Sequence, residues 1–302
     1  MTIDVHQHLW GEHFVEVLHR RTRPPRLRGW TLHTDTQAPY DVDPTTHDVA
    51  GRVALEQRVN TSAACVSLSS PLGVEYADDG AGLLDAYHAD ALALPEPFRA
   101  WSAVSMIEPS LSDLERQLAG DFVGLQLPAD ALGTPDGWER LAPVLDVVAT
   151  AGKPLLVHPG PVTTPPQLPA WWAPVVQYVD QLSAAWWAWH LAGRKVAPRL
   201  RVCFVAAAGL APVHHERLVA RGGSFTAVDP DVFVDTSSYG PRALDAVIRV
   251  LGIDAVVLGS DRPYAEPTAP DLGAAAQHAI CTTNPLRLLG WSAPTDAEEG
   301  TP

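Results

Sequence analysis

Short apolar runs alternate with stretches of helical spacing along the whole 302-residue chain. Runs with the length of a strand lie at residues 3–8, 61–68, 99–106, 122–127, 154–157, 201–205, 232–235 and 255–258. Continuous apolar strands that alternate with helices are typical of a parallel sheet covered by helices. Eight such units over this length predict an α/β fold, the closed (β/α)8 TIM barrel, which typically needs about 250 residues. A doubly wound open sheet is the alternative.

No domain linker interrupts this alternation before residue 291. We therefore expect a single barrel domain over residues 1–291, followed by a disordered tail over 292–302, which is rich in acidic and small residues. The stretch 21–46 is rich in Pro and Arg, and we expect an irregular active-site loop there, because long connections are often functional.

An insertion at about 159–198 is longer than an ordinary connection between a strand and a helix. Its tryptophans are Trp171, Trp172, Trp186, Trp187 and Trp189. Aromatic side chains dominate both ligand pockets and protein interfaces. The insertion can cap the barrel mouth, line a substrate pocket or form the contact of a homodimer, and simple helix packing is the fourth interpretation.

The charge balance argues against two classes of partner. A formal net charge of −14 would repel nucleic acid and anionic membrane surfaces alike. The N-terminus has no basic region followed by an apolar stretch, and no apolar run reaches the roughly 18 residues of a membrane span. We therefore expect a cytoplasmic protein with a small-molecule substrate, and with neither a nucleic-acid nor a membrane partner.

Two histidines at alternate positions end the first predicted strand. Residues i and i+2 of a strand face the same side, so His6 and His8 can bind one cation while Gln7 points away. Paired histidines also occur on solvent-facing strands, so this pattern alone leaves both interpretations open.

Two later strands also end in residues that can bind a metal. His158 ends the run 154–157, and Asp261 follows the run 255–258. In a (β/α)8 barrel the carboxyl ends of all strands meet at one face, so these side chains are expected beside His6 and His8. Three imidazoles and one carboxylate suit Zn²⁺ or another divalent transition metal, with room for a water molecule. We predict one divalent ion, Zn²⁺.

Four segments in this order resemble the amidohydrolase superfamily, and more narrowly its amidohydrolase-2 branch, which includes aminocarboxymuconate semialdehyde decarboxylase. The segments are 4–8 (DVHQH), 152–159 (GKPLLVHP), 259–264 (GSDRPY) and 284–290 (NPLRLLG). The resemblance implies a distorted (β/α)8 barrel that usually holds zinc. It also implies His6, His8, His158 and Asp261 as the metal ligands, and either hydrolysis of amides, esters or lactones or decarboxylation of unsaturated acids.

The sequence departs from the family pattern at the sixth strand. Where the family usually carries His-x-Gly-Gly-x-x-Pro, residues 206–212 read AAAGLAP, so Ala206 takes the histidine position. An alanine side chain neither binds a metal nor transfers a proton, which argues against a binuclear site. His214 and His215 either substitute for the histidine or are exposed helix residues.

Several residues are candidates for catalysis or for substrate binding. Asp261 can accept a proton from a metal-activated water and return it to the leaving group, or serve as a ligand only. Arg262 can bind a substrate carboxylate or pair with Glu266 or another acid. The remaining candidates lie on stretches that approach the mouth and have packing as the alternative role: Trp10, Gln126 and Tyr239.

These features lead to three hypotheses of function. The first is a metal-dependent hydrolase of a small, cyclic or aromatic carboxylate, acting through metal-activated water. The second is a metal-dependent non-oxidative decarboxylase. The third, motivated by Ala206, is a catalytically silent barrel that keeps its metal.

Overall fold

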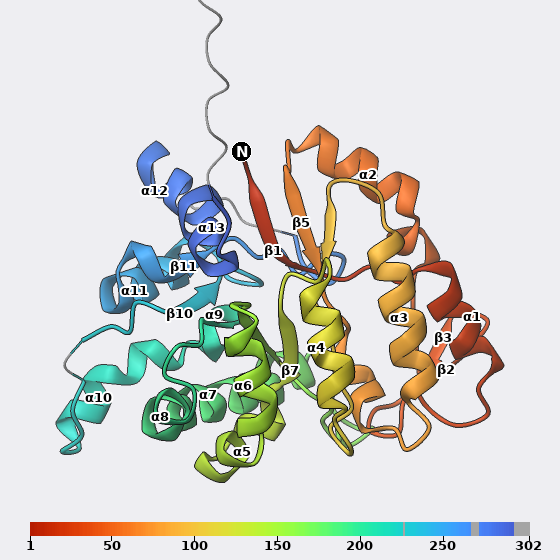
Figure 1. Ribbon diagram of the computed structural model, residues 1–302, viewed down its shortest axis with the longest axis horizontal. Helices are drawn as coiled ribbons and strands as arrows, with labels where there is room; N and C mark the ends of the chain where they lie inside the picture. Colours follow the sequence, from red (N-terminus) through yellow and green to blue (C-terminus); the bar gives the residue numbers. More distant parts are fainter. Residues whose placement is uncertain (226, 267–271, 293–302) are drawn as a thin grey trace, which may run out of the picture.

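A computed structural model describes residues 1–225, 227–266 and 272–292 and shows parallel strands surrounded by helices (Figure 1). The barrel strands form two hydrogen-bonded groups, in the orders β1-β5-β6 and β11-β10-β9-β8-β7, and every pairing in them is parallel. Their bounds are β1 (Ile3–Gln7), β5 (Ala63–Val66), β6 (Phe98–Ala100), β7 (Leu125–Pro128), β8 (Leu155–His158), β9 (Val202–Phe204), β10 (Val232–Asp235) and β11 (Val256–Val257).

Backbone hydrogen bonds join the two groups of strands at both edges. Beyond β6, the Ser102 N–H donates to the Gly124 carbonyl at 2.8 Å, next to β7. On the other side, the Val5 N–H donates to the Leu258 carbonyl at 2.9 Å, which connects β1 with the end of β11. The eight strands therefore close into a ring, and the predicted (β/α)8 barrel is confirmed.

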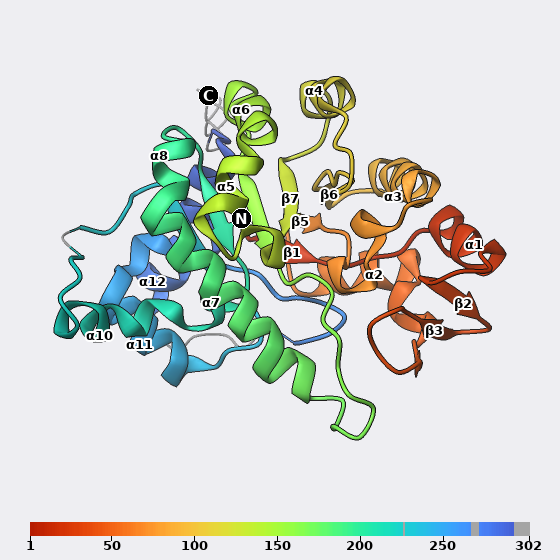
Figure 2. The same ribbon diagram turned by 90° about the horizontal axis from the view of Figure 1, so that it is seen from below.

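The helices cover the outside of the barrel (Figures 1 and 2). Helix α11 illustrates how an amphipathic helix packs on the barrel. Its side chains Leu244, Val247 and Leu251 are buried on one face, and Gly252, with a φ of 82°, follows its last residue. The α-helices are α1 (Glu12–Arg20), α2 (Val49–Arg58), α3 (Ala81–Ala93), α4 (Leu111–Ala119), α5 (Pro135–Arg140), α6 (Ala142–Thr150), α7 (Tyr178–Ala188), α8 (Arg194–Val196), α9 (Ala206–Gly209), α10 (His215–Ala220), α11 (Pro241–Leu251), α12 (Ala274–His278) and α13 (Asn284–Leu289).

We predicted that the stretch 21–46 would be irregular, and this prediction is wrong for part of it. It contains a small antiparallel sheet of β2 (Arg26–Arg28), β3 (Thr31–His33) and β4 (Tyr40–Asp41). Leu27 and Leu32 face each other across β2 and β3 and are fully buried. Strands of two or three residues are too short for the period-two alternation that reveals a strand in a sequence.

The tryptophan-rich insertion forms a long helix around α7, extended by π-helical turns at Ala173–Gln177 and Trp189–Gly193. Trp186 and Trp189 are fully buried, as helix packing requires, whereas Trp171 is 56% exposed. The predicted homodimer contact stays a prediction.

The start of the insertion meets the stretch after β1 at the barrel mouth. Thr164 donates its backbone N–H to the Thr36 carbonyl at 3.0 Å. The amide of Gln37 donates to the hydroxyl of Tyr178, also at 3.0 Å. These two hydrogen bonds join the segment that follows β1 to the segment that follows β8.

The predicted disordered tail covers residues 292–302, of which 293–302 lie outside the described residues. The prediction of a single domain over residues 1–291 stays a prediction. None of the helices in the described ranges has both the length and the apolar character needed to cross a membrane.

The chain turns in a left-handed sense directly after β9. Ala206, Ala207, Ala208, Gly209 and Leu210 have φ values of 46°, 48°, 53°, 58° and 61°. Left-handed backbone costs an alanine roughly 1–2 kcal/mol, because its Cβ approaches the following carbonyl oxygen. The turn is therefore strained, and it lies where a barrel strand enters the mouth.

Ala208→Gly is expected to raise the free energy of unfolding by up to about 1 kcal/mol, since relief of the left-handed strain exceeds the roughly 0.8 kcal/mol lost with a buried methyl group. Ala89→Gly, on the exposed face of α3, is the control and should lower it by about 1 kcal/mol. Urea denaturation measures both, and a loss of stability at position 208 would contradict the strain.

Candidate metal centre

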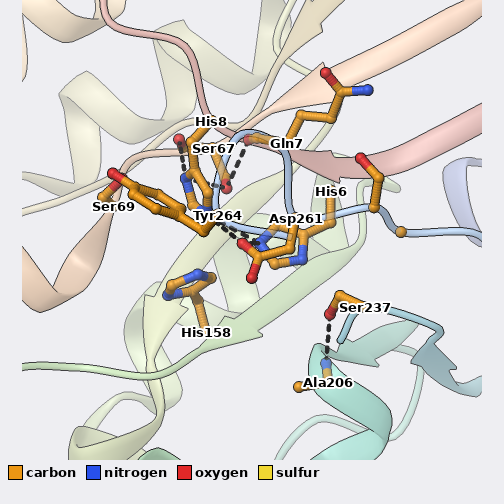
Figure 3. A network of polar contacts seen from close by, with 12 residues as sticks. His6, Gln7, His8, Ser67, Ser69, His158, Ala206, Ser237, Asp261 and Tyr264 are labelled. Atoms are coloured by element: carbon orange, nitrogen blue, oxygen red, sulfur yellow. Dashed lines mark hydrogen bonds and ion pairs between the residues drawn. The ribbon is translucent and has the colours of Figure 1, made fainter. Parts of the chain in front are cut away.

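The four predicted ligands lie together at the carboxyl ends of the barrel strands (Figure 3). His6 and His8 come from the end of β1, His158 from the last position of β8, and Asp261 from the segment after β11. One ligand atom from each lies within 4.8 Å of all the others. The two Nε2 atoms of His6 and His8 are 3.1 Å apart, and Asp261 Oδ1 is 3.2 Å from His8 Nε2.

The three imidazoles face one point from mutually perpendicular planes. Ring centroids are 5.0 Å apart for His6 and His8, 5.1 Å for His6 and His158, and 5.0 Å for His8 and His158, with interplanar angles of 84°, 81° and 85°. His6, His8 and His158 would hold one divalent cation together with Asp261, three through imidazole nitrogens and one through a carboxylate oxygen.

Backbone carbonyls orient two of the rings. His8 Nδ1 donates to the Ser67 carbonyl at 2.9 Å, and His158 Nδ1 donates to the Pro159 carbonyl at 3.0 Å. A carbonyl only accepts, so the proton of each neutral ring is on Nδ1 and the lone pair of Nε2 is free for a metal.

A carboxylate orients the third ring. Asp235, at the end of β10, accepts from His6 Nδ1 through Oδ2 at 2.8 Å and is fully buried. Its Oδ1 accepts from the Ala206 N–H at 2.7 Å and from the Ser237 hydroxyl at 2.6 Å. Asp235 therefore connects His6, a candidate metal ligand, to the left-handed turn that begins at Ala206.

The protonation preferences agree with this geometry. Burial, with the charges of His8 and His6, holds the pKa of His158 well below its usual value, and burial also lowers the pKa of His8. Burial acts in the same direction on His6, but the hydrogen bond and the charge of Asp235 outweigh it and raise its pKa. Two of the rings thus favour the neutral form that binds metals.

The donor set fits a divalent transition metal. Three neutral imidazole nitrogens and one carboxylate suit zinc or manganese, and the geometry leaves positions open for a substrate. The prediction of a divalent metal site is supported by the cluster.

Two further features of the last segment shape the mouth. Asp261 has a φ of 61° and a side chain that is 21% exposed, so it is the ligand most open to solvent. The ring of Tyr264 lies 5.2 Å from that of His8, and its hydroxyl is 3.3 Å from the Ser69 hydroxyl (Figure 3).

Arg262 takes the structural role left open for it in the sequence. Its guanidinium is buried, donates to both carboxylate oxygens of Glu56 at 3.1 and 3.3 Å, and lies 3.5 Å from Glu266. The partner Glu56 is on α2, outside the ring of strands. A contact between Arg262 and a substrate stays a prediction.

The other three residues predicted to contact substrate differ in burial and in their neighbours. Gln126, on β7, is fully buried and donates to the Leu68 carbonyl at 2.8 Å. Tyr239 is half-buried after β10, where burial and the charge of Asp235 raise its pKa. Trp10 is buried two residues beyond His8.

His214 is exposed, as predicted for a helix residue, but the same prediction for His215 is wrong. His215 packs against Trp186, which donates from Nε1 to His215 Nε2 at 3.3 Å, and against Phe225. Neither histidine joins the ligand cluster found among the described residues.

The sequence prediction missed Asp235, Ser67 and Tyr264. Asp235 had a signal, because it is a possible metal-site residue at the end of an apolar strand, as His158 is. Ser67 had none, since it contributes a backbone carbonyl to the centre.

No protein-family model matches this sequence, and no curated protein does. Solved structures do match in fold. IDCase from Metarhizium anisopliae has a TM-score of 0.73 and 17% identity over 96% of this chain and 97% of its own. The 5-carboxyvanillate decarboxylase of Novosphingobium aromaticivorans, complexed with manganese and 4-hydroxy-3-methoxy-5-nitrobenzoic acid, has a TM-score of 0.70 and 16% identity over 96% of each chain.

A third match is 4-oxalomesaconate hydratase from Rhodopseudomonas palustris, with a TM-score of 0.66 and 15% identity over 96% of each chain. These neighbours include a decarboxylase and a hydratase. The resemblance expected from the sequence is therefore confirmed at the level of the fold, which at such identities is what the likeness establishes.

Asp235→Asn is expected to weaken Mn²⁺ binding by about 10- to 100-fold, because His6 loses the carboxylate that orients its ring and raises its basicity. Asp245→Asn, on the exposed face of α11, is the control. Titration with Mn²⁺, followed by the electron paramagnetic resonance of the free ion, measures both. Equal affinities would show that Asp235 does not support the centre.

Arg262→Leu is expected to lower the free energy of unfolding by about 3–5 kcal/mol, because it leaves the Glu56 carboxylate buried without its partner. The matched control is Arg249→Leu, which removes an exposed ion pair with Asp245 and should change stability far less, because solvent screens an exposed pair. If chemical denaturation gave similar values for the two variants, the Arg262–Glu56 pair would not have the structural role assigned to it.

Proposed function

We propose that this chain is a metal-dependent decarboxylase of small aromatic carboxylates. The observation that carries the proposal is the convergence of three imidazole Nε2 atoms and the Asp261 carboxylate at the barrel mouth. The decarboxylases among the structural neighbours support this reaction, and one of them is complexed with a hydroxylated nitrobenzoic acid.

His6, His8, His158 and Asp261 would hold one divalent ion. When bound, the ion supplies positive charge that holds and polarises substrate oxygens. Zinc is the metal expected from the sequence, whereas manganese is the metal named with two of the neighbours, and the donor set accommodates both.

Asp261 is proposed to move the proton. Its carboxyl group is the ligand most open to the mouth, and its Oδ1 lies near the Nε2 atoms of both His6 and His8. In its protonated form it delivers one proton to the ring carbon that bears the carboxylate. The bond between that carbon and the carboxylate then breaks, its electron pair returns to the ring, and carbon dioxide leaves.

Hydrolysis, the leading hypothesis from the sequence, is the second candidate. The hydratase among the neighbours favours it, since hydration and hydrolysis both add water to the substrate. In this reaction Asp261 would accept a proton from the attacking water rather than deliver one to carbon. The two candidates share the site and differ in the product.

A silent barrel is the third possibility, because Ala206 replaces the family's histidine. The Ala206 N–H is committed to Asp235 and its methyl group offers no proton. Turnover by the native chain decides against this possibility, and activity that appears only in Ala206→His decides for it.

The protein purified without added metal is expected to contain about one divalent ion per chain and to release carbon dioxide from 2,6-dihydroxybenzoate or 5-carboxyvanillate. In D₂O the product should carry deuterium at the former carboxylate carbon. His158→Ala should lower kcat/KM at least about 1,000-fold by removing a ligand, while the control His214→Ala, at an exposed position, should retain activity. A hydrolysis product containing ¹⁸O from labelled water, without carbon dioxide, would refute the decarboxylase.

A further inference from the structure

Two buried N–H groups on chain segments that adjoin His8 have no acceptor among the residues that the structure describes. They are Nε1 of Trp10 and Nε2 of His47, in side chains that are 4% and 6% exposed. The two rings stack in parallel, with centroids 4.4 Å apart and an interplanar angle of 10°. The donors therefore belong to one rigid pair.

The backbone determines which nitrogen of His47 carries the proton. The Trp10 backbone N–H donates to His47 Nδ1 at 3.2 Å, so Nδ1 must present its lone pair. The ring proton is then on Nε2, which makes that atom a donor. His47 and Trp10 thus offer one donor each.

The pair lies on two chain segments that adjoin His8. Trp10 is two residues beyond His8, and His47 is the last residue of the 3-10 helix Pro44–His47, which leads into α2. Arg52, on α2, donates to the His8 carbonyl at 2.8 Å and to the Thr46 carbonyl at 3.2 Å. These hydrogen bonds hold the segment that contains His47 against the chain as it leaves the metal centre.

A buried donor without an acceptor is unfavourable, and native proteins usually provide a partner. Trp101 shows the usual solution, since its Nε1 donates to the Val5 carbonyl at 2.9 Å. Trp138 and Trp189 also have indole nitrogens without a partner among the described residues, but both lie in the outer helical layer. The Trp10–His47 pair differs because two such donors occur together beside a metal ligand.

Arg52 and Arg262 each donate from terminal guanidinium nitrogens to acceptors within the protein, while the Nε of each has no hydrogen-bond partner among the described residues. Arg262 pairs with Glu56, and Arg52 donates to Gln7 Oε1 at 2.5 Å as well as to His8. Trp10 Nε1 and His47 Nε2 differ from these guanidinium groups, because each is the one N–H donor of a neutral ring and has no acceptor among the described residues.

We propose that Trp10 Nε1 and His47 Nε2 form a subsite for a substrate oxygen outside the carboxylate that the metal holds, such as a ring hydroxyl or a second carboxylate. This inference rests on the proposed function, since it assumes an aromatic carboxylate at the metal. It makes the pair a determinant of specificity, because an aromatic acid without a further oxygen leaves both donors unpaired.

Calorimetric titration of the Mn²⁺-loaded protein tests the subsite without needing turnover. The probes are 2,6-dihydroxybenzoate, 5-carboxyvanillate and benzoate, which has no oxygen beyond its carboxylate. Trp10→Phe removes one donor and keeps an aromatic ring. His47→Asn places an amide oxygen near the position of Nδ1, to accept from the Trp10 backbone, and removes the distal donor. Trp138→Phe is the matched control, since it removes a buried indole N–H from the outer layer.

The native protein should bind at least one oxygenated probe more than tenfold tighter than benzoate. Each variant of the pair should weaken that binding about tenfold or more while changing benzoate affinity less than twofold, and Trp138→Phe should change neither. Equal losses for all probes, unchanged affinities, or a native protein that prefers no oxygenated probe would overturn the subsite. Probe binding without carbon dioxide release would leave the subsite standing and count against the proposed decarboxylation alone.

Discussion

The contact between the first and last barrel strands is the interaction on which the site depends. Residues about 250 positions apart meet there: Asp261 donates its backbone N–H to the His6 carbonyl at 2.9 Å, and His8 donates to the Arg262 carbonyl at 2.6 Å. Each contact joins one ligand to the opposite strand end. If this edge opened, two of the histidines would separate from the carboxylate, and a cation would lose its donor set.

Two buried carboxylates, those of Asp4 and Glu56, also hold β1 against the segment after β11. Asp4 accepts from the His6 N–H at 3.1 Å and from the Ser260 N–H at 3.0 Å, so one carboxylate connects both strand ends. Outside the ring of strands, Glu56 accepts from Gln7 and Arg262. Buried ionic groups rarely add net stability, but their geometry specifies one arrangement of the chain. Here that arrangement is the register between β1 and the segment after β11.

Much of the barrel and its ligands could be predicted because apolar strands and their polar ends are local features of the sequence. His158 and Asp261 follow uninterrupted apolar runs, and the barrel topology alone brings them to one face. The burial of His215 could not be read in this way, because it depends on Trp186 from a helix far away in the chain. The left-handed turn at Ala206 was equally hidden, since alanine has no sequence preference for that conformation.

The three imidazole rings of the candidate metal centre differ in the kind of group that orients them. His8 and His158 are oriented by carbonyls of the main chain, which every amino acid supplies, so drift at positions 67 and 159 leaves these acceptors in place. His6 depends on a side-chain carboxylate, Asp235, which also accepts from the backbone N–H of Ala206 in the left-handed turn. A substitution at position 235 would thus change the basicity of His6 and the backbone that follows β9 at the same time.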